Sequence, residues 1–506
     1  MIMIRSRKLH TFSLGLTVVL GFWFLSRVHE FSAVQWNERY LTDVHDAIYP
    51  MSDSDNADEN HDGAAVKYYG GDSSIGDSGK GSVHGAGVDA DQKESQAQPS
   101  PIPDAPVLVD YGAEKDADRE IVPTSSSLSP SQSQSPSAKL EMTNEMVGKY
   151  VRSIMDYHDN TTLSRLACPA HIGRRYDHLR EDPSYGASSR IKYFFALDLY
   201  QSAAILPRLM GSIVEVIRFL GPERCAVSVI EGRSEDGTYE ILAALKKEVE
   251  SLGSRFYLDR SSINPKSDGV NRIAALAELR NMALAPLTPA HRDSGLYLPD
   301  AIIIFVNDIS LCAEDILELV HQHVTQSAHM TCAFDWLYAG TLFYDVWVSR
   351  TLVGNLFFEI PQDGSWDYRD TLFFDDPDSK RRYDAFQPVQ VYACWGGMIT
   401  IDAGPFATGS LKFRASDEDE CYMGEPTLLA KDLWRQGLGK IMAVPAVNVA
   451  YSDEEATGTK TNRGYVGDRV DLMSIDQEER YKWQDEPPGL VKCLPSFNRP
   501  SWVKPV

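Results

Sequence analysis

Oxygen-bearing side chains directly follow an apolar stretch that has the character of a buried strand. Asn307 and Asp308 come after the run Ala301–Val306, AIIIFV. Mg²⁺ and Mn²⁺ prefer oxygen ligands and usually take one or two carboxylates when they bridge a substrate's phosphates. Asp308 is therefore a candidate ligand for such a metal. The alternative is an aspartate that caps the helix predicted to follow it.

A second acidic residue stands beside an indole, Asp335-Trp336, after the predicted strand 329–334. This pair suits a sugar site, where it could hold a hydroxyl group or accept a proton. The alternative is a structural tryptophan next to an aspartate whose hydrogen bonds are satisfied within the protein.

A polar loop, EGRSEDGT at 231–238, follows the apolar run 225–230. Its two glycines permit positive φ or a close approach of the backbone to a ligand. Ser234 or Asp236 could cap the next helix, whose N-terminus favours an anion. The alternative is an ordinary turn with a helix cap.

Alternating apolar runs and amphipathic segments predict the elements that position these residues. Strands are predicted at 193–197, 225–230, 255–258, 301–306 and 329–334, and helices at 202–220, 239–252, 270–284 and 313–326. Near-continuous apolar strands separated by helices favour a mainly parallel sheet covered on both faces. In such sheets ligands bind at the carboxyl ends of the strands, where the polar residues above stand.

The N-terminus predicts a membrane anchor. The run Leu9–Leu25 contains no charged residue and is near the lower limit of about 17–25 residues for a spanning helix. Arg5, Arg7 and Lys8 precede it, which predicts a cytoplasmic tail at 1–8 and a lumenal location for the rest. The alternative is a cleaved signal peptide, which the bulky residues at 22–24 disfavour.

Residues 26–145 are predicted to form a disordered, acidic, Ser/Pro-rich stem. Between 41 and 140 there are 18 acidic and 6 basic residues, and such a segment buries too little apolar surface to offset the entropy of ordering. The chain as a whole has a net charge of −23, which argues against a nucleic-acid partner. Seven cysteines in a lumenal chain predict one to three disulfides and at least one unpaired thiol.

Several blocks in the C-terminal two thirds resemble the fungal capsule-associated α-1,3-mannosyltransferases, glycosyltransferase family 69. The resemblance runs from about Tyr193 to Tyr451. Its blocks are VIEGRSEDGT at 229–238, NRIAALAELRNMAL at 271–284, FVNDISLCAEDILEL at 305–319, MTCAFDWLYAG at 330–340, FYDVWVSRTLVGN at 343–355, VYACWGGM at 391–398 and CYMGEPTLLAKDLWRQGLGKIMAVPAVNVAY at 421–451.

The resemblance implies a GT-A-like nucleotide-sugar-binding domain at 146–506, held by its anchor in the Golgi membrane as a single-pass type II protein. It implies transfer of mannose from GDP-mannose to an α-mannoside acceptor, with retention and with Mn²⁺ or Mg²⁺, in the synthesis of a cell-surface or capsular glycoconjugate. Association with other transferases is a further expectation.

The same resemblance implies roles for individual residues. Asp308 binds the metal, and the nucleotide and its diphosphate are bound by Glu231, Arg233, Asp236, Arg280, Asn281 and Asn307. Asp335, Trp336 and Glu425 serve the sugar and the acceptor. Where the family commonly has Cys-Trp-Asn-Gly, this chain has glycine at position 396, which removes an amide and implies a changed acceptor, weaker activity or no effect.

Two alternatives remain open from the sequence. One is a transferase of the same fold that uses another donor, such as UDP-xylose or UDP-glucuronate. The other is a catalytically silent member that organises other transferases in the membrane.

Overall fold

The structure is a computed structural model that describes residues 142–180, 190–291, 293–359, 371–474, 480–495 and 499–505. The predicted tail at 1–8, the predicted anchor at 9–25 and the predicted stem up to residue 141 lie outside these residues. Within the described ranges, no helix combines the length and the apolar character needed to cross a bilayer. All the described residues belong to one unit of the fold.

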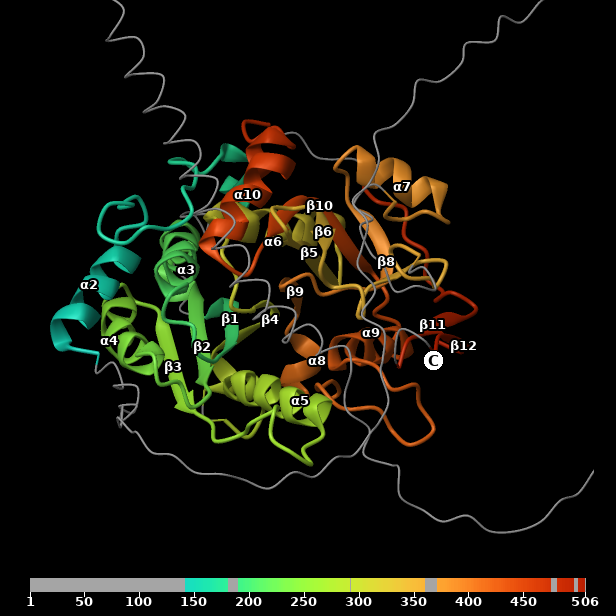
Figure 1. Ribbon diagram of the computed structural model, residues 1–506, viewed down its shortest axis with the longest axis horizontal. Coiled ribbons are helices and arrows are strands. Elements are labelled where there is room, and N and C mark those ends of the chain that lie inside the picture. Colours follow the sequence, from blue (N-terminus) through green and yellow to red (C-terminus); the bar gives the residue numbers. More distant parts are fainter. Residues whose placement is uncertain are drawn as a thin grey trace, which may run out of the picture. The chain divides into compact units, whose positions relative to one another are not determined.

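The described chain alternates strands and helices (Figure 1). The strands are β1 Ile191–Leu199, β2 Cys225–Glu231, β3 Arg255–Arg260, β4 Tyr297–Val306, β5 Met330–Leu337, β6 Leu342–Phe343, β7 Arg350–Thr351, β8 Val389–Ala393, β9 Met398–Asp402, β10 Ile441–Val449, β11 Val491–Cys493 and β12 Ser501–Val503. The α-helices are α2 Asn144–Met155, α3 Leu206–Leu220, α4 Thr238–Ser251, α5 Arg272–Ala283, α6 Ala313–Gln326, α7 Pro377–Asp384, α8 Gly404–Ala407, α9 Glu425–Arg435 and α10 Asp453–Arg463.

The central sheet is mixed rather than mainly parallel. Its strand order is β3-β2-β1-β4-β9-β5-β10-β8-β7, with β6 paired to β5. The strands β3, β2, β1 and β4 are parallel, as predicted. The strand β9, which the sequence analysis did not predict, lies between β4 and β5 and runs antiparallel to both. This insertion separates two strands that follow each other in the chain and makes the second half of the sheet mixed.

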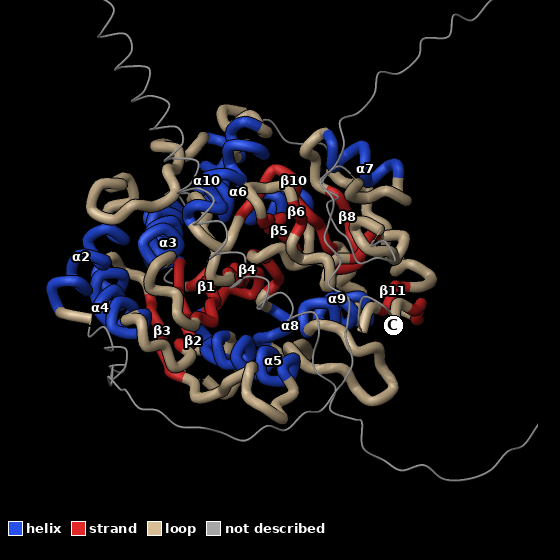
Figure 2. Tube along the Cα trace, in the orientation of Figure 1, coloured by secondary structure: helices blue, strands red, loops and turns tan. Residues whose placement is uncertain are grey.

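Helices cover both faces of the sheet (Figure 2). Successive residues of a strand point to opposite sides of the sheet, so each strand contributes side chains to two cores. In β1, Phe195 and Leu197 pack in a core with residues of α3, α4 and α6. Phe194 and Ala196 face the other way and pack in a second core with residues of α5 and α9. Burial of these strands on both faces explains their continuous apolar character.

The predicted elements in the first half of the fold are confirmed, with differences at their ends. The helix α6 has the predicted bounds, 313–326. The helix α3 begins at Leu206 rather than 202, with Pro207 in its first turn, where a missing backbone N–H costs nothing. The strand β5 continues to Leu337, because it pairs with β10 and β6 beyond the predicted end at 334. Asp335 and Trp336 are therefore strand residues and not loop residues.

Three disulfides join segments that are far apart in the sequence. They join Cys168 to Cys312, Cys332 to Cys394 and Cys421 to Cys493, and Cys225 is a buried free thiol. The number of bridges agrees with the prediction. Each bridge has one cysteine within four positions of a predicted site residue, Asp308, Asp335 or Glu425.

Candidate active site

Two aspartates stand where the neighbouring parallel strands β1 and β4 end. Asp198 is the second-last residue of β1, and Asp308 follows β4, whose Phe305 pairs with Ala196. Asp308 is exposed to solvent, yet the surrounding protein desolvates its carboxyl group and, with the charge of Asp198, raises its pKa to about 7. Burial raises the pKa of Asp198 to about 6. The two carboxyl groups are thus close enough to repel each other when ionised.

Arg280 of α5 and Glu425, the first residue of α9, form a buried ion pair beside these aspartates. The distance between Arg280 Nε and Glu425 Oε1 is 3.1 Å, and the side chains are 9% and 3% exposed. Both charges act on the pKa of Asp198, Arg280 lowering it and Glu425 raising it. Arg280 Nη1 is buried and has no hydrogen-bond partner in the described structure, so a donor remains available to an anion.

Trp395 fixes the position of the Arg280 guanidinium group, which lies over its ring at 3.9 Å from the centroid. The indole Nε1 donates to Asn307 Oδ1 at 3.2 Å. The backbone N–H of Asn307 donates in turn to the carbonyl oxygen of Gly397 at 2.9 Å. The loop that carries Asn307 and Asp308 is thereby joined to the segment 395–397 and, through the indole ring, to Arg280.

Two further carboxyl groups, those of Asp335 and Asp345, lie together on the other side of the segment 395–397. Asp335 is 1% exposed and accepts a hydrogen bond from the Tyr451 hydroxyl at 2.7 Å. Its Oδ1 has no hydrogen-bond partner among the residues that the structure describes. Burial, and then the charge of Asp345, raise its pKa well above the ordinary value.

Asp345 joins this pair to the arginine. Its Oδ2 accepts a hydrogen bond from the backbone N–H of Gly396 at 2.8 Å. Burial raises its pKa to about 6, and the charges of Arg280 and Glu425 also act on it. We call Asp198, Asp308, Asp335, Asp345 and Glu425 the acidic cluster. Arg280 is the basic residue that pairs with it directly.

The structure does not bring Trp336 to the acidic cluster. Because Trp336 follows Asp335 within β5, its side chain points to the opposite face of the sheet. The ring is fully buried, its Nε1 donates to Asn448 Oδ1 at 2.8 Å, and the Arg463 guanidinium group lies over it. Its hydrogen-bonding group and one face of its ring therefore contact other parts of the protein and not the acidic cluster.

Asn281 also works within the fold rather than toward a ligand. Its Nδ2 donates to the carbonyl oxygen of Phe413 at 2.8 Å, and its Oδ1 accepts from the N–H of the same residue at 2.9 Å. This pair of bonds holds the segment around Phe413 against α5. Phe413 packs in turn on Trp395, with ring centroids 5.9 Å apart, so Asn281 supports the site indirectly.

The predicted nucleotide residues of the loop after β2 lie at the same edge of the sheet. Glu231 is fully buried and accepts hydrogen bonds from Ser234 N at 2.6 Å and Arg260 Nε at 3.0 Å. Asp236 accepts from Thr238 N at 3.0 Å, at the start of α4, and from Ala203 N at 2.9 Å. These two carboxylates organise the loop.

Arg233 reaches out from the same loop. It has φ +64°, donates to the carbonyl oxygen of Ile263, and lies over the ring of Tyr200 at 5.0 Å. Tyr200, which follows β1, is 49% exposed. An exposed aromatic ring beside a guanidinium group is a suitable surface for a planar base.

Position 396 has room only for glycine. Gly396 has φ +60°, and a Cβ atom there would lie 1.9 Å from the carbonyl oxygen of Ala333. The segment could not keep its position with a side chain at 396, so the glycine is part of the geometry that brings the Gly396 N–H to Asp345.

Sequence analysis assigned no role to Asp198, Tyr200, Asp345 or Tyr451, and Asp345 appeared there only within the block 343–355. A signal for Asp198 was present, since it follows the apolar run 193–197 as Asp308 follows 301–306. Asp345 and Tyr451 lie in the second half of the fold, where β6 and β10 were not predicted.

The described residues fit a metal held by few protein ligands. They contain no group of three or more histidine, cysteine or acidic side chains arranged to hold an ion. Asp308 is exposed, no other described residue donates a hydrogen bond to its carboxylate, and its neighbour Asp198 repels it. One or two carboxylates of this kind suit Mg²⁺ or Mn²⁺ when a diphosphate supplies further oxygens.

Comparison with known proteins adds independent information. The family model described as Cryptococcal mannosyltransferase 1 matches residues 192–432. The chain is 35% identical over 326 residues to "Alpha-1,3-mannosyltransferase CMT1" of Cryptococcus neoformans var. neoformans serotype D, which covers 61% of this chain and 69% of that protein.

Two solved structures show weak similarity. One is S. aureus TarS 1–349, with 11% identity, a TM-score of 0.31, and 52% of this chain and 60% of that chain covered. The other is the mannosyltransferase PcManGT from Pyrobaculum calidifontis in complex with GDP-Man and Mn²⁺, with 12% identity, a TM-score of 0.31, and coverage of 60% and 65%. The chain thus spans less than two thirds of either.

The α/β fold and the sequence matches together define a glycosyltransferase, as predicted. Within that class, the chain belongs to the cryptococcal mannosyltransferase 1 family. The predicted resemblance to the fungal capsule-associated mannosyltransferases is thereby confirmed.

Proposed function

We propose that this protein transfers mannose from GDP-mannose to an α-mannoside acceptor, forming an α-1,3 linkage with retention, in the synthesis of a cell-surface or capsular glycoconjugate. One observation carries the proposal: in this member of the family, the acidic cluster lies around Arg280 at the carboxyl ends of the strands. The GT-A-like character of the domain belongs to the same proposal.

The diphosphate end of the donor would lie between Asp308 and Arg280. Asp308, with Asp198 beside it, would hold Mn²⁺ or Mg²⁺, which when bound neutralises charge on the diphosphate. Arg280 would direct its free Nη1 donor to a phosphate oxygen. Its ion pair with Glu425 and its contact with Trp395 hold the guanidinium group in place before the substrate arrives, which favours stabilisation of the departing GDP.

The sugar and the acceptor would lie on the side of Asp335 and Asp345. The unpartnered Oδ1 of Asp335 can bind a hydroxyl group of mannose or of the acceptor. The acceptor hydroxyl would attack the anomeric carbon from the face that GDP leaves, which preserves the configuration. Glu425 would act through Arg280 as a positioning residue, because its Oε1 pairs with that guanidinium group.

The nucleotide end would extend toward the loops after β1 and β2. The exposed ring of Tyr200 and the adjacent Arg233 offer a stacking surface for guanine. Stacking of a base on an aromatic ring contributes about 1–3 kcal/mol in nucleic-acid binding. Glu231 and Asp236 would keep these loops in shape through their backbone hydrogen bonds.

A lumenal location belongs to the proposal as well. Three disulfides in one chain are characteristic of an oxidising compartment. The anchor at 9–25, with basic residues before it, would make the chain a type II protein of the Golgi membrane. Association with other transferases there is a part of the proposal that rests on sequence resemblance alone.

The test is a donor panel with the full-length chain purified in detergent. We expect product from GDP-mannose, Mn²⁺ and a short α-mannoside, with an α-anomeric linkage by NMR. Product from UDP-xylose or UDP-glucuronate instead would replace the donor assignment. A folded chain that neither reacts with any donor nor gains thermal stability from one would favour the non-catalytic organising role.

A further inference from the structure

An exposed turn after α2 carries an acceptor sequence for N-glycosylation, Asn160-Thr161-Thr162. By the pattern Asn-x-Ser/Thr, this sequence occurs once in the chain. Asp159 shapes the turn, because its Oδ1 accepts hydrogen bonds from Thr161 N at 2.8 Å and Thr162 N at 3.1 Å. The side chain of Asn160 is exposed.

The two ends of the Asn160 amide differ in their surroundings. Its Oδ1 accepts hydrogen bonds from Arg165 Nε at 3.3 Å and from Arg208 Nη2 at 3.2 Å. Its Nδ2 donates to no other residue in the described ranges. The amide oxygen therefore points to the protein, and the amide nitrogen is left for solvent or for a modification.

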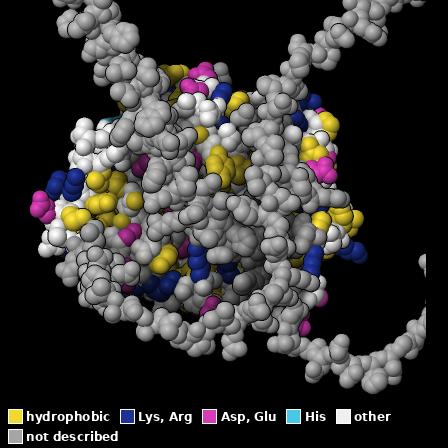
Figure 3. Space-filling view, viewed as in Figure 1, with side chains coloured by type: hydrophobic (Ala, Val, Ile, Leu, Met, Phe, Trp, Pro, Cys, Tyr) yellow, Lys and Arg dark blue, Asp and Glu magenta, His cyan; other side chains and the backbone are white. Residues whose placement is uncertain are grey.

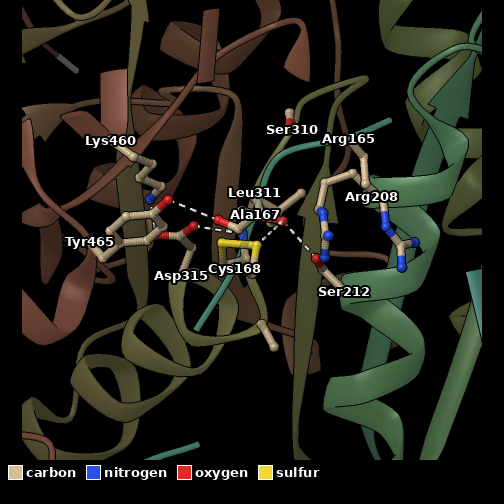
Figure 4. The surroundings of a disulfide bond; sticks show 12 residues. Arg165, Ala167, Cys168, Arg208, Ser212, Ser310, Leu311, Asp315, Lys460 and Tyr465 are labelled. Carbon is tan, nitrogen blue, oxygen red and sulfur yellow. Dashed lines mark hydrogen bonds and ion pairs between the residues drawn. A yellow bond between two sulfur atoms is a disulfide. The ribbon is translucent and has the colours of Figure 1, made fainter. Parts of the chain in front are cut away.

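The two arginines that hold this oxygen lie side by side (Figure 4), and both are buried. Arg208, on α3, is fully buried, and within the described part of the chain its Nε and Nη1 have no hydrogen-bond partner. Burial, and then the charge of Arg165, lower its pKa to about 10. In the described structure, Arg208 donates to Asn160 Oδ1. Its guanidinium group also lies over the ring of Tyr157, at 4.9 Å from the centroid.

This arrangement adjoins the loop that carries Asp308. Ser212, one turn along α3 from Arg208, donates to the carbonyl oxygen of Leu311 at 2.6 Å. Cys168 is linked to Cys312 in the same place (Figure 4). The turn at Asn160 thus lies on the outer side of a packed region whose inner side holds the β4–α6 loop.

We infer that Asn160 carries an N-linked glycan on Nδ2 while its Oδ1 continues to hold Arg165 and Arg208. The inference rests on the lumenal location proposed above. The new bond joins Nδ2 to the anomeric carbon of an oligosaccharide; the donor is a lipid-linked oligosaccharyl diphosphate, whose diphosphate leaves as Nδ2 loses a proton. The product is still an amide, so its carbonyl oxygen remains an acceptor for both arginines.

The modification is tested on the full-length chain made in a eukaryotic secretory host. We expect digestion with an endoglycosidase to increase its electrophoretic mobility. Asn160→Asp and Thr162→Ala should lose this shift. Thr162→Ser should keep it, as should Thr161→Ala, which removes a hydroxyl bond to Asp159 but preserves the acceptor sequence. A parent chain whose mobility does not change overturns the inference, and so does a shift that persists in Asn160→Asp.

The role of the amide oxygen is tested by thermal stability with the glycan absent from every variant. Asn160→Asp supplies a carboxylate to the arginines and should melt no lower than Thr162→Ala, whereas Asn160→Ala should melt below both. Equal melting temperatures for Asn160→Ala and Thr162→Ala would overturn the proposed role of the amide oxygen. The same samples are also assayed for mannose transfer, which separates the two proposals. An active parent without a glycan refutes only the proposed glycosylation. A glycosylated, inactive parent refutes only the proposed transferase activity.

Discussion

Arg280 and Glu425 face each other across the ends of α5 and α9, with 3.1 Å between Nε and Oε1. Their helices are 142 or more residues apart in sequence, so the pair exists only in the folded chain. Trp395 lies against the guanidinium group at 3.9 Å. The arginine is thus fixed by a charge and an aromatic ring at once, and its Nη1 has no hydrogen-bond partner in the described ranges.

Removing one member of this pair should harm both stability and turnover. Arg280→Ala leaves Glu425 buried without its cation, and we expect a loss of about 3–5 kcal/mol in the free energy of unfolding. Glu425→Gln releases the guanidinium group and should lower kcat by about 100-fold. Arg381→Ala is the control, because Arg381 and its partner Asp378 are exposed. Activity unchanged in both pair variants would contradict the role of Arg280.

Asp308→Asn should abolish the dependence of activity on a divalent metal along with most of the activity. We expect kcat/KM to fall by at least about 100-fold, because the donor's diphosphate loses its neutralising ion. Chelation should abolish the activity of the parent, and Mn²⁺ should restore it. Asp300→Asn is the matched control, because Asp300 lies on β4, the strand that precedes Asp308, and is paired with Lys192 away from the site. A variant that retains metal-dependent turnover would place the metal elsewhere.

The raised pKa of Asp345 predicts a stability difference that depends on pH. A carboxyl group whose pKa is higher in the folded state than the ordinary 3.8 stabilises the fold below that value, and this contribution is lost as pH rises to about 6. Asp345→Asn should therefore gain stability relative to the parent between pH 4 and 7, on the order of 1 kcal/mol after allowance for solvent screening, or about 2–4 °C in Tm.

Glu420 supplies the control of opposite sign. Hydrogen bonding to Arg414 lowers the pKa of Glu420, so its contribution is present above the ordinary value and is lost as pH falls. Glu420→Gln should thus melt below the parent at pH 7 and approach it in acid. Parallel pH profiles for the parent and Asp345→Asn would show that Asp345 titrates at its ordinary pKa.

The disulfide between Cys332 and Cys394 should matter for catalysis as well as for stability. It joins β5, which carries Asp335, to the segment that carries Trp395 and Gly396, and it closes a separation of 62 residues. Loop-closure entropy predicts a loss of about 4 kcal/mol in the double Cys→Ala variant. We expect kcat to fall at temperatures where the variant is still folded by circular dichroism. Cys225→Ala, which breaks no bridge, is the control.

Restoring the family's asparagine at position 396 should disturb the site. A Cβ atom there would meet the Ala333 carbonyl oxygen at 1.9 Å, so Gly396→Asn must shift the backbone and lose the hydrogen bond to Asp345. We expect lower Tm and lower kcat, and Gly397→Ala, also at positive φ but with its nearest contact at 3.1 Å, should be milder. A gain in activity in Gly396→Asn would instead favour a direct contact between that amide and a sugar.

The sequence was most informative where strands are buried on both faces and alternate with helices. The pattern predicted the strands β1 to β5 and the helices α3 to α6. It thereby predicted the helix that carries Arg280 and the strand that precedes Asp308. It was less informative after residue 337, because β6, β7 and β9 are short and β9 gains its place only by pairing with two distant strands. Asp345 follows β6 and Tyr451 follows β10, and neither strand, nor its pairing with β5, was predicted. The proximity of these two residues to Asp335 was therefore not predictable.

Side-chain direction was the other limit. Asp335 and Trp336 are adjacent in sequence and were assigned a common role, but the extension of β5 to Leu337 sends them to opposite faces. Asn281 is one residue from Arg280, yet its amide holds the backbone of Phe413. In both pairs one residue points to the candidate site and its neighbour to the protein interior, a distinction that requires the element boundaries to be known within a residue.

The bridge from Cys168 to Cys312 also has a mechanical consequence. It closes a covalent loop over a separation of 144 residues, within which all of β1, β2, β3 and β4 lie. A tension applied between the two ends of the chain would pass from Cys168 to Cys312 through the sulfur atoms and bypass these four strands. The parallel half of the sheet, with the end of β1 and the start of the Asp308 loop, would therefore stay unloaded while segments outside the loop were stretched.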